Sequence, residues 1–414
     1  MSKPTSPSRR TFLSLGAATA AAGVWVPRPV RGYAAAEVAA RIENGVGMSK
    51  WDLDTPALCV DLDRLERNIA TMQAAAKRFG IATRPHAKTH KSADIAKMQL
   101  AAGAIGICTA KLGEADALMA QGVDRICMTT SNLSPAKIRR AMELRKKSGA
   151  FIQATDTEEN ARALSAAARE AGVTADVVID VAVGTRSGIP PDESAVRLAK
   201  LVDTLPHLTL RGLLSYDGGA QHINGFAARK TRTLANIEPN VRVREAMHKA
   251  GLDTEIFSGG GTGTYNLQHL VPGFTDIQVG SYLFMDMQYL AIGREDGGPV
   301  YDDFASSLTV VGTVVNNRFP GRLTTDAGAK ALTLNTPRAG VIGEPGADYN
   351  AGSDEFGVIT FPNGGPARTW KIGDRIEMIV PHCDPVVNLY DVMYGIRNDK
   401  VEKIIAVTAR GRSQ

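Results

Sequence analysis

The stretch Ala82-Thr83-Arg84-Pro85-His86-Ala87-Lys88-Thr89-His90-Lys91 begins with a short extended run and continues into a loop rich in basic side chains. Seven further short apolar runs follow it, and amphipathic helical stretches separate them. This alternation is typical of repeated βα units around a parallel sheet, and eight strands are the number that a closed barrel needs. We therefore predict an α/β fold with a TIM-type (β/α)8 barrel, whose strands are Ala82 to Arg84, Ala104 to Thr109, Arg125 to Thr129, Phe151 to Ala154, Asp176 to Val181, Leu210 to Ser215, Glu255 to Ser258 and Ile277 to Gly280.

A second domain of a different kind is expected after the barrel. Beyond Asp302 the helical periodicity fades, and turns rich in Gly and Pro separate extended runs. The expected strands are Ser307 to Val315, Lys330 to Leu334, Gly357 to Phe361, Arg375 to Val380 and Lys403 to Val407. We therefore predict a barrel over residues 63–300 and a C-terminal β domain over residues 301–414. Residues 37–62 form a segment whose run Leu58 to Leu62 adds a strand to the β domain.

The helix expected after this strand has its own signals. Leu65, Ile69 and Met72 recur at spacings of four and three, which places them on one face of a helix. Asp63 and Glu66 resemble the N-cap and N3 residues of a capping box.

The N-terminal end has the pattern of a twin-arginine export signal. Ser8-Arg9-Arg10-Thr11-Phe12-Leu13 leads into a small, apolar run from Ser14 to Val26. This run is shorter than the ~20 residues of a membrane-spanning helix, and Ala34-Ala35-Ala36 offers small residues for cleavage. We therefore predict a signal peptide over residues 1–36, a periplasmic location, and no membrane association after signal removal.

Charge and cysteine usage exclude two classes of protein. The formal net charge is +5, but five basic residues of the predicted signal supply it, so the remaining chain is close to neutral. It therefore lacks the basic surface of a nucleic-acid-binding protein. The four cysteines lie far apart, and three of them fall in apolar runs, so buried free thiols are expected rather than a disulfide framework.

The loop Arg84 to Lys91 carries the first candidate catalytic group. It follows the C-terminal end of the first barrel strand, and catalytic residues of such barrels lie at this end. A lysine among His86, His90 and other cations has a disfavoured ammonium form and a more nucleophilic amine. Lys88 is thus a candidate for Schiff-base chemistry, although composition alone favours a solvated basic loop.

Two loops with glycines are candidates for binding phosphate. Ser258-Gly259-Gly260-Gly261-Thr262-Gly263-Thr264 follows the seventh strand, and Gly280-Ser281-Tyr282 follows the eighth. Loops after these two strands commonly bind phosphate in such barrels, because glycines let backbone N–H groups converge on the oxygens. A turn without a ligand is the plainer interpretation of each loop alone. Their position on the same barrel face as Lys88 predicts a phosphate-bearing aldehyde cofactor.

Pro381-His382-Cys383-Asp384-Pro385 contains a candidate metal pair. If the extended conformation of the preceding strand continues, His382 and Asp384 point to one side and Cys383 to the other. An imidazole and a carboxylate on one side form half of a metal site. A hydrogen-bonded pair at a domain edge is the alternative.

Together these motifs resemble one family. The run Arg84 to Lys91, the loop Ser258 to Gly261, Gly280-Ser281-Tyr282-Leu283-Phe284-Met285-Asp286 and the triplet His382-Cys383-Asp384 are similar to those of D-threonine aldolase, D-3-hydroxyaspartate aldolase and D-serine dehydratase. The resemblance spans about Leu53 to Ala406. It implies an alanine racemase-like barrel with a C-terminal β domain, pyridoxal 5'-phosphate as the cofactor, and a homodimer.

The resemblance also implies roles for individual residues. Lys88 would carry the cofactor, and Arg186 would lie near the phenolic oxygen of the cofactor. Tyr216 would lie beside the ring, and His222 near the substrate hydroxyl as the candidate base. The phosphate would be bound by Ser258, Gly259, Gly260, Gly261, Thr262, Gly280, Ser281 and Tyr282. Taken without the resemblance, Arg186 could be a surface charge and His222 an ordinary loop histidine.

The metal pair separates two branches of the family. In the dehydratase relatives a cysteine stands where this chain has Asp384, and a carboxylate moves the preference from zinc towards manganese or magnesium. The resemblance therefore implies an aldolase that cleaves β-hydroxy-D-amino acids of the D-threonine type to glycine and an aldehyde. Phe356 stands where relatives often carry histidine, so the fit around the β-carbon is expected to differ.

Three other activities remain as alternatives. The nearest is a dehydratase that converts D-serine to pyruvate and ammonia. A racemase is less favoured because it leaves the metal pair unexplained. A non-catalytic cofactor carrier is less favoured because such small proteins typically lack the C-terminal β domain.

Overall fold

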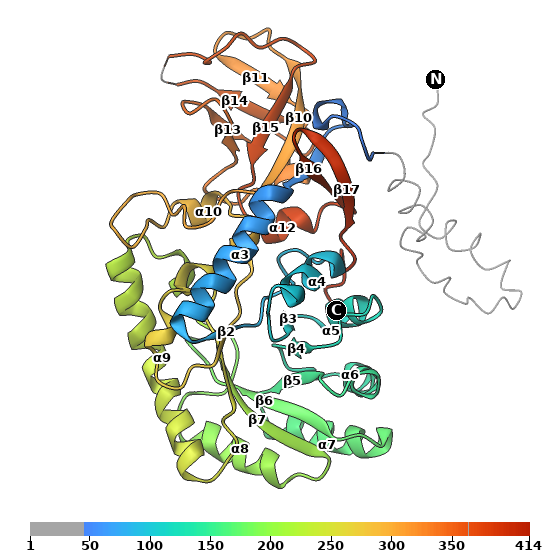
Figure 1. Cartoon of the computed structure of the whole chain (residues 1–414), viewed down its shortest axis with the longest axis vertical. Helices are drawn as coiled ribbons and strands as arrows, with labels where there is room; N and C mark the ends of the chain where they lie inside the picture. The colour runs from blue at the N-terminus through green and yellow to red at the C-terminus, as the bar shows by residue number, and fades with distance from the viewer. Residues whose placement is uncertain (1–44, 363) are drawn as a thin grey trace, which may run out of the picture.

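The computed structural model describes residues 45–362 and 364–414, so the predicted export signal and its cleavage site lie outside the described residues. An eight-stranded sheet and a nine-stranded sheet follow one another along the long axis of the molecule (Figure 1). Within the described residues, no helix has both the length and the apolar composition needed to cross a membrane.

The eight-stranded sheet is a parallel barrel. Its strands are β2 (Ala82–Thr83), β3 (Ile107–Thr109), β4 (Ile126–Met128), β5 (Ile152–Thr155), β6 (Ala175–Asp180), β7 (Leu208–Ser215), β8 (Ile256–Gly259) and β9 (Asp276–Ile277), in the order β2-β9-β8-β7-β6-β5-β4-β3. Beyond β2 the edges meet, because Cys108 N donates to Pro85 O at 2.7 Å and Ala87 N donates to Cys108 O at 2.8 Å. All eight predicted strands overlap these elements, and the predicted TIM-type barrel is confirmed.

Helices alternate with the barrel strands. They are α3 (Leu62–Phe79), α4 (Ala93–Ala101), α5 (Leu112–Met119), α6 (Pro135–Lys147), α7 (Glu158–Ala171), α8 (Glu193–Thr204) and α9 (Phe226–Lys249). The predicted cap of the first of them is wrong by two residues: Asp61 is the N-cap, and its side chain accepts from Arg64 N. Leu65, Ile69 and Met72 are buried, as the spacing predicts, because they form the face of α3 that packs on the core.

The second sheet combines strands from both ends of the described chain. It contains β1 (Ala57–Asp61), β10 (Leu308–Asn316), β11 (Arg322–Thr325), β12 (Gly340–Val341), β13 (Asp348–Asn350), β14 (Gly357–Thr360), β15 (Arg375–Ile379), β16 (Val392–Arg397) and β17 (Lys400–Ala406). β1 lies between β10, which is antiparallel to it, and β16, which is parallel. The strand predicted over Lys330 to Leu334 is wrong, because residues Ala329–Leu332 form the short helix α11.

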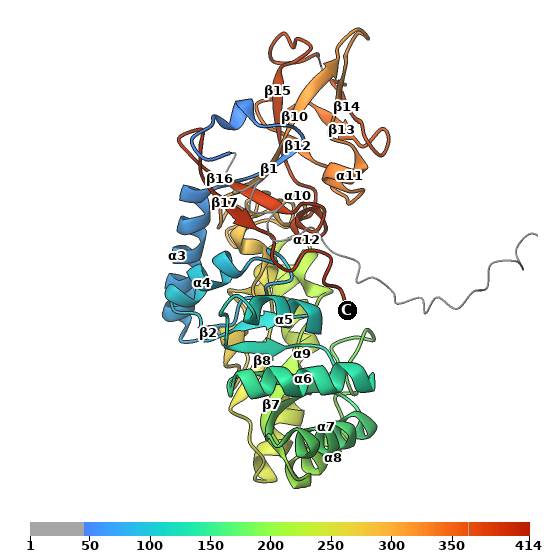
Figure 2. The same ribbon diagram turned by 90° about the vertical axis from the view of Figure 1, so that its right-hand side faces the viewer.

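Two short helices lie where the sheets meet. α10 (Met287–Leu290) follows the last barrel strand, and α12 (Cys383–Val387) follows β15 (Figures 1 and 2). After β17 the chain returns to the barrel beside α5, where Gly113 N donates to Gln414 O at 2.8 Å. All four cysteines are buried free thiols, as expected from the sequence.

Candidate active site

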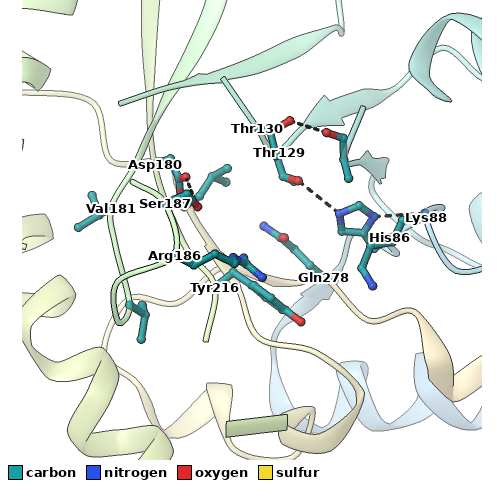
Figure 3. A pocket seen from close by; sticks show the side chains of 13 residues that line it. His86, Lys88, Thr129, Thr130, Asp180, Val181, Arg186, Ser187, Tyr216 and Gln278 are labelled. Atoms are coloured by element: carbon teal, nitrogen blue, oxygen red, sulfur yellow. Dashed lines mark hydrogen bonds between the residues drawn. The ribbon is translucent and has the colours of Figure 1, made fainter. Parts of the chain in front are cut away.

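A cavity of about 210 Å³ opens at the C-terminal ends of the barrel strands. Side chains that follow β2, β4, β6, β7 and β9 converge on it (Figure 3). They include His86, Lys88, Thr129, Thr130, Asp180, Arg186, Ser187, Tyr216 and Gln278. Three residues predicted for the site, Lys88, Arg186 and Tyr216, therefore share one cavity.

Of the two lysines in the rim loop, Lys88 is the one that lines the cavity. Its side chain is 37% exposed and contacts the Asp384 carboxylate. The Lys91 side chain is 9% exposed and forms an ion pair with Glu114 at 2.5 Å. Glu114 also accepts from Ala110 N at 3.0 Å, so it fixes Lys91 away from the cavity.

The contact between Lys88 and Asp384 joins the barrel to the segment that follows β15. Burial alone would lower the pKa of Lys88, but the neighbouring Asp384 carboxylate raises it overall. Burial alone would raise the pKa of Asp384, but the Lys88 ammonium lowers it overall. The two groups therefore form a charged pair where the two sheets meet.

His86 orders the loop around Lys88. Its Nδ1 accepts from Lys88 N at 3.3 Å, which leaves Nε2 to donate to Thr129 Oγ1, also at 3.3 Å (Figure 3). Burial, with Lys88 as a second cause, lowers the pKa of His86 well below the usual value, so the ring is neutral. The imidazole of His86 thus adds no charge beside Lys88.

Arg186 and Tyr216 lie together on the opposite wall of the cavity. The guanidinium carbon of Arg186 lies 5.1 Å from the centre of the Tyr216 ring, within the range of a cation–π contact (Figure 3). Arg186 follows β6 and Tyr216 follows β7, and these strands are adjacent in the barrel. Their pairing gives the cavity an aromatic face with a fixed positive charge.

The glycine-rich loop after β8 is closely packed. A Cβ atom on Gly260 would lie 2.6 Å from Gln268, and one on Gly261 would lie 2.7 Å from Gln221, so neither position has room for a side chain. The buried amide of Gln268 has no hydrogen-bond partner among the described residues. An unpaired buried donor is what a phosphate group requires, so the amide of Gln268 fits the expected cofactor. The N–H groups of Gly261 and Gly263 already have partners, because they donate to Thr264 Oγ1 at 3.3 Å and to Gln221 Oε1 at 3.0 Å.

Other residues expected to bind phosphate already have partners. The Ser258 hydroxyl donates to Asp276 at 2.5 Å, inside the barrel. Tyr282 N donates to Thr262 Oγ1 at 2.9 Å, and the Tyr282 hydroxyl accepts from Gln99 at 3.0 Å. These contacts tie together the two loops that follow β8 and β9.

The backbone of residues 381–384 differs from the extended conformation assumed from the sequence. β15 ends at Ile379, His382 is extended at the N-cap, and α12 begins at Cys383. The expected alternation of side chains therefore does not hold. The Asp384 carboxylate nevertheless reaches Lys88, and His382 turns towards a different partner, Asp286.

Asp286 is a site residue that the sequence did not single out. Its Oδ2 lies 2.8 Å from His382 Nδ1 and accepts from Cys383 N at 2.9 Å. The potential ligand atoms of Asp286, His382 and Cys383 lie within 4.8 Å of one another. Burial raises the pKa of Cys383 well above the usual value, so this residue is a neutral thiol when no ion is bound. No spacing rule connects Asp286 with His382, because only the fold brings them together.

His222 lies beside this group. It belongs to the short 3-10 helix η2 (Ala220–His222), and its ring centre is 6.3 Å from that of His382 and 4.6 Å from that of Tyr289. Burial lowers the pKa of His222, so the ring is neutral at neutral pH and can accept a proton.

Two family models match the chain in succession. The alanine racemase N-terminal domain matches residues 60–288, and the putative serine dehydratase domain matches residues 307–396. 3-Hydroxy-D-aspartate aldolase of Paracoccus denitrificans is 34% identical over 369 residues, which are 88% of this chain and 94% of the relative. The chain belongs to the D-threonine aldolase family of alanine racemase-like enzymes.

The chain is also similar to two further members of this family, an aldolase and a dehydratase. The crystal structure of D-threonine aldolase from Filomicrobium marinum matches with a TM-score of 0.84 at 32% identity, and the match covers 89% of this chain and 99% of that one. D-threo-3-hydroxyaspartate dehydratase of Delftia is 30% identical over 80% of this chain and 91% of its own length. Membership makes the chain a pyridoxal phosphate-dependent lyase.

Proposed function

We propose that this protein is a pyridoxal phosphate- and divalent metal-dependent aldolase that cleaves β-hydroxy-D-amino acids of the D-threonine type to glycine and an aldehyde. The observation that carries the proposal is the contact between Lys88, which lines the cavity, and Asp384. Asp384 stands two residues after His382 in the sequence. This contact supports the proposal because it brings the proposed cofactor lysine beside one of the two proposed metal ligands.

The barrel residues bind and orient the cofactor in this proposal. Lys88 carries it, the loop Ser258 to Thr262 and the turn Gly280 to Tyr282 hold its phosphate, and Arg186 and Tyr216 face the ring. When bound, pyridoxal phosphate acts as the electron sink for the carbanion at Cα.

The residues beyond the barrel act on the β-hydroxyl group. His382 and Asp384 hold the divalent ion, which supplies Lewis acidity at that hydroxyl. Manganese or magnesium suits this nitrogen and oxygen pair better than zinc with a thiolate would. His222, whose neutral ring faces His382, accepts the hydroxyl proton as Cα and Cβ separate.

The closest alternative is elimination of the β-hydroxyl group. It is favoured by the relative named D-threo-3-hydroxyaspartate dehydratase, which is 30% identical. Asp384 argues against it, because a carboxylate holds a harder ion that promotes deprotonation of the hydroxyl rather than its departure.

One experiment separates these reactions. The metal-supplemented enzyme is incubated with D-threonine, L-threonine and D-serine, and glycine, acetaldehyde and pyruvate are assayed. The proposal expects glycine and acetaldehyde from D-threonine alone. Faster release of pyruvate from D-serine would replace the aldolase with a dehydratase and leave the fold and Lys88 untouched.

Export and dimerisation complete the proposal. The twin arginines Arg9 and Arg10 and the apolar run behind them support export to the periplasm. Replacing both arginines by lysine in the full chain should retain the protein in the cytoplasm. Sedimentation of the purified enzyme should give the mass of a dimer, as the resemblance implies.

A further inference from the structure

The carboxylate of Asp286 is buried and engaged by three donors. Oδ1 accepts from Tyr289 N at 3.0 Å, which caps α10. Oδ2 lies 2.8 Å from His382 Nδ1 and accepts from Cys383 N at 2.9 Å. The residue has no exposed surface, so it is an internal anchor and not a surface charge.

The backbone around Asp286 is joined to the backbone before His382. Met287 N donates to Val380 O at 3.1 Å, and Gln288 N donates to Pro381 O at 3.2 Å. Met285, just before Asp286, has a φ of 47° in the left-handed region, which costs a residue with a Cβ about 1–2 kcal/mol. Local strain of this kind persists only where the surrounding contacts hold it, so the direction of Asp286 is built into the fold.

We propose that Asp286 is a positioning residue: it holds the Nδ1–H of His382 and thereby reserves Nε2 of that ring as the metal ligand. Carboxylates accept the second ring N–H of metal-binding histidines in this way, which fixes the tautomer and the orientation of the ring. The inference rests on the proposed function, in which His382 binds the divalent ion.

A direct role as a ligand is the competing interpretation, because the atoms of Asp286, His382 and Cys383 lie close enough to surround an ion. Three observations oppose it. Three of about four acceptor positions of the Asp286 carboxylate are already used. The nearest nitrogen of His382 faces the carboxylate as its hydrogen-bond partner. The Cys383 thiol, the third member of the group, is buried and donates to Asp384 Oδ1 at 3.5 Å.

The same residue links the two functional regions of the site. Asp286 ends the run that begins with the turn Gly280 to Tyr282, through the 3-10 helix η5 (Ser281–Leu283). A single rigid connection thus sets both the proposed phosphate turn and the ring of His382.

The test is the binding of Mn²⁺ alone to the cofactor-loaded enzyme, measured by titration calorimetry for the wild type, Asp286→Asn and His382→Ala. We expect Asp286→Asn to raise the dissociation constant about 10–100-fold, while the visible band of the bound cofactor stays unchanged. His382→Ala should abolish specific binding. Asp286→Glu, which keeps the carboxylate on a longer side chain, should recover part of the affinity.

Asp326→Asn is the matched control. Asp326 also accepts a backbone N–H, from Thr313 at 2.7 Å, and a hydroxyl, from Thr55, but it lies in the nine-stranded sheet next to β11. This variant should bind Mn²⁺ as the wild type does. The absorption of Co²⁺-loaded enzyme adds a spectroscopic readout: the positioning role predicts the same band shape in Asp286→Asn as in the wild type at saturating Co²⁺.

Two results would overturn the inference. Unchanged Mn²⁺ affinity in Asp286→Asn would leave Asp286 with a structural role only. Loss of binding as complete as in His382→Ala, with an altered Co²⁺ spectrum, would make Asp286 a ligand. If the wild type itself bound no divalent ion, the metal part of the proposed function would fail first, so the two failures are distinguishable.

Discussion

The rim loop Arg84–Lys91 and the segment Pro381–Asp384 contribute to one site, but the protein holds them in different ways. The rim loop is fixed from within the barrel, by backbone bonds to β3 and by the ion pair between Lys91 and Glu114. The segment after β15 is fixed from distant parts of the chain, by backbone bonds from Met287 and Gln288. Side chains add to this, Asp286 for His382 and Lys88 for Asp384. The direction of Lys88 thus follows from its place on a strand end, whereas the directions of His382 and Asp384 depend on long-range partners.

This difference suggests separate tasks. A group that carries a cofactor needs one permanent position, which a barrel rim provides. Groups that hold an ion need second contacts that fix their orientation, and Asp286 provides such a contact for His382. Mutations in the first region should therefore remove the cofactor, and mutations in the second should remove only the metal.

The largest effect is expected at Lys88. Lys88→Ala should lose the visible band of the bound cofactor after dialysis and reduce turnover by at least about 10³-fold, because the reactive amine is gone. Absorbance and borohydride trapping are the measurements. Lys91→Arg, which removes the other amine of the loop and keeps a cation opposite Glu114, should retain the band. A reducible lysine adduct in Lys88→Ala would refute the assignment.

The second effect concerns the metal ligands. His382→Ala and Asp384→Ala should each lower the aldolase rate about 10²-fold and abolish its response to added Mn²⁺, while the cofactor band remains. Cys383→Ser should be much milder, because the thiol is not one of the two proposed ligands. Chelation followed by metal titration checks this. An equal loss of aldolase activity in all three variants would refute the assignment of the metal pair. A wild-type enzyme whose activity is unchanged by chelators would refute it as well.

A third, smaller effect tests the branch of the family. Asp384→Cys should bind zinc more tightly and lose about 10-fold in aldolase rate, because a thiolate favours a softer ion that assists departure of the hydroxyl. Acetaldehyde from D-threonine and pyruvate from D-serine are compared under zinc and under manganese. No shift in metal preference would show that the residue at this position does not select the ion.

A fourth prediction concerns the anchoring of the rim loop. Glu114→Gln leaves the buried Lys91 without its partner and should lower the free energy of unfolding by about 3 kcal/mol. The double variant Lys91→Met with Glu114→Gln replaces the pair by neutral groups and should recover most of the loss. Thermal unfolding is the measurement. Equal stability of wild type and single variant would mean that the pair does not hold the loop.

The smallest effect is a pH dependence at Asp180, which lines the cavity. Burial, with the Asp156 charge as a second cause, raises the pKa of Asp180 to about 6. The stability that the protonated carboxyl contributes is therefore complete below about pH 4 and is lost as the pH rises through about 6. Asp180→Asn should gain stability relative to the wild type between these pH values. Melting curves that stay parallel from pH 4 to 7 would contradict this.

The sequence was sufficient where a local rule determines the structure. Short apolar runs between amphipathic helical stretches located all eight barrel strands, and the position of Lys88 after the first of them predicted its place at the rim. The predicted strand over Lys330 to Leu334 failed because Ala329–Leu332 is one helical turn, too short for periodicity to identify. The capping residue of α3 was predicted at Asp63 and lies at Asp61. Both are aspartates, which are favoured at the N-cap, so the sequence does not distinguish them.

The region around His382 could not be predicted for a different reason. Side-chain alternation requires a continuing strand, and α12 interrupts it at Cys383. Asp286 was missed because its partner, His382, is distant in sequence and the contact depends on how two sheets meet. For His382 and Asp286, the limit of sequence prediction is therefore the contact between the two domains.

The position of β1 has a consequence for synthesis of the chain. This strand is completed before any part of the barrel, yet its neighbours β10 and β16 are made only after the barrel strands. Ala57 in β1 therefore cannot pair with Val311 in β10 until Val311 has been synthesised. Long-range pairing of this kind is slow because the intervening loop must close first. The nine-stranded sheet therefore cannot be completed until all the barrel strands have been synthesised.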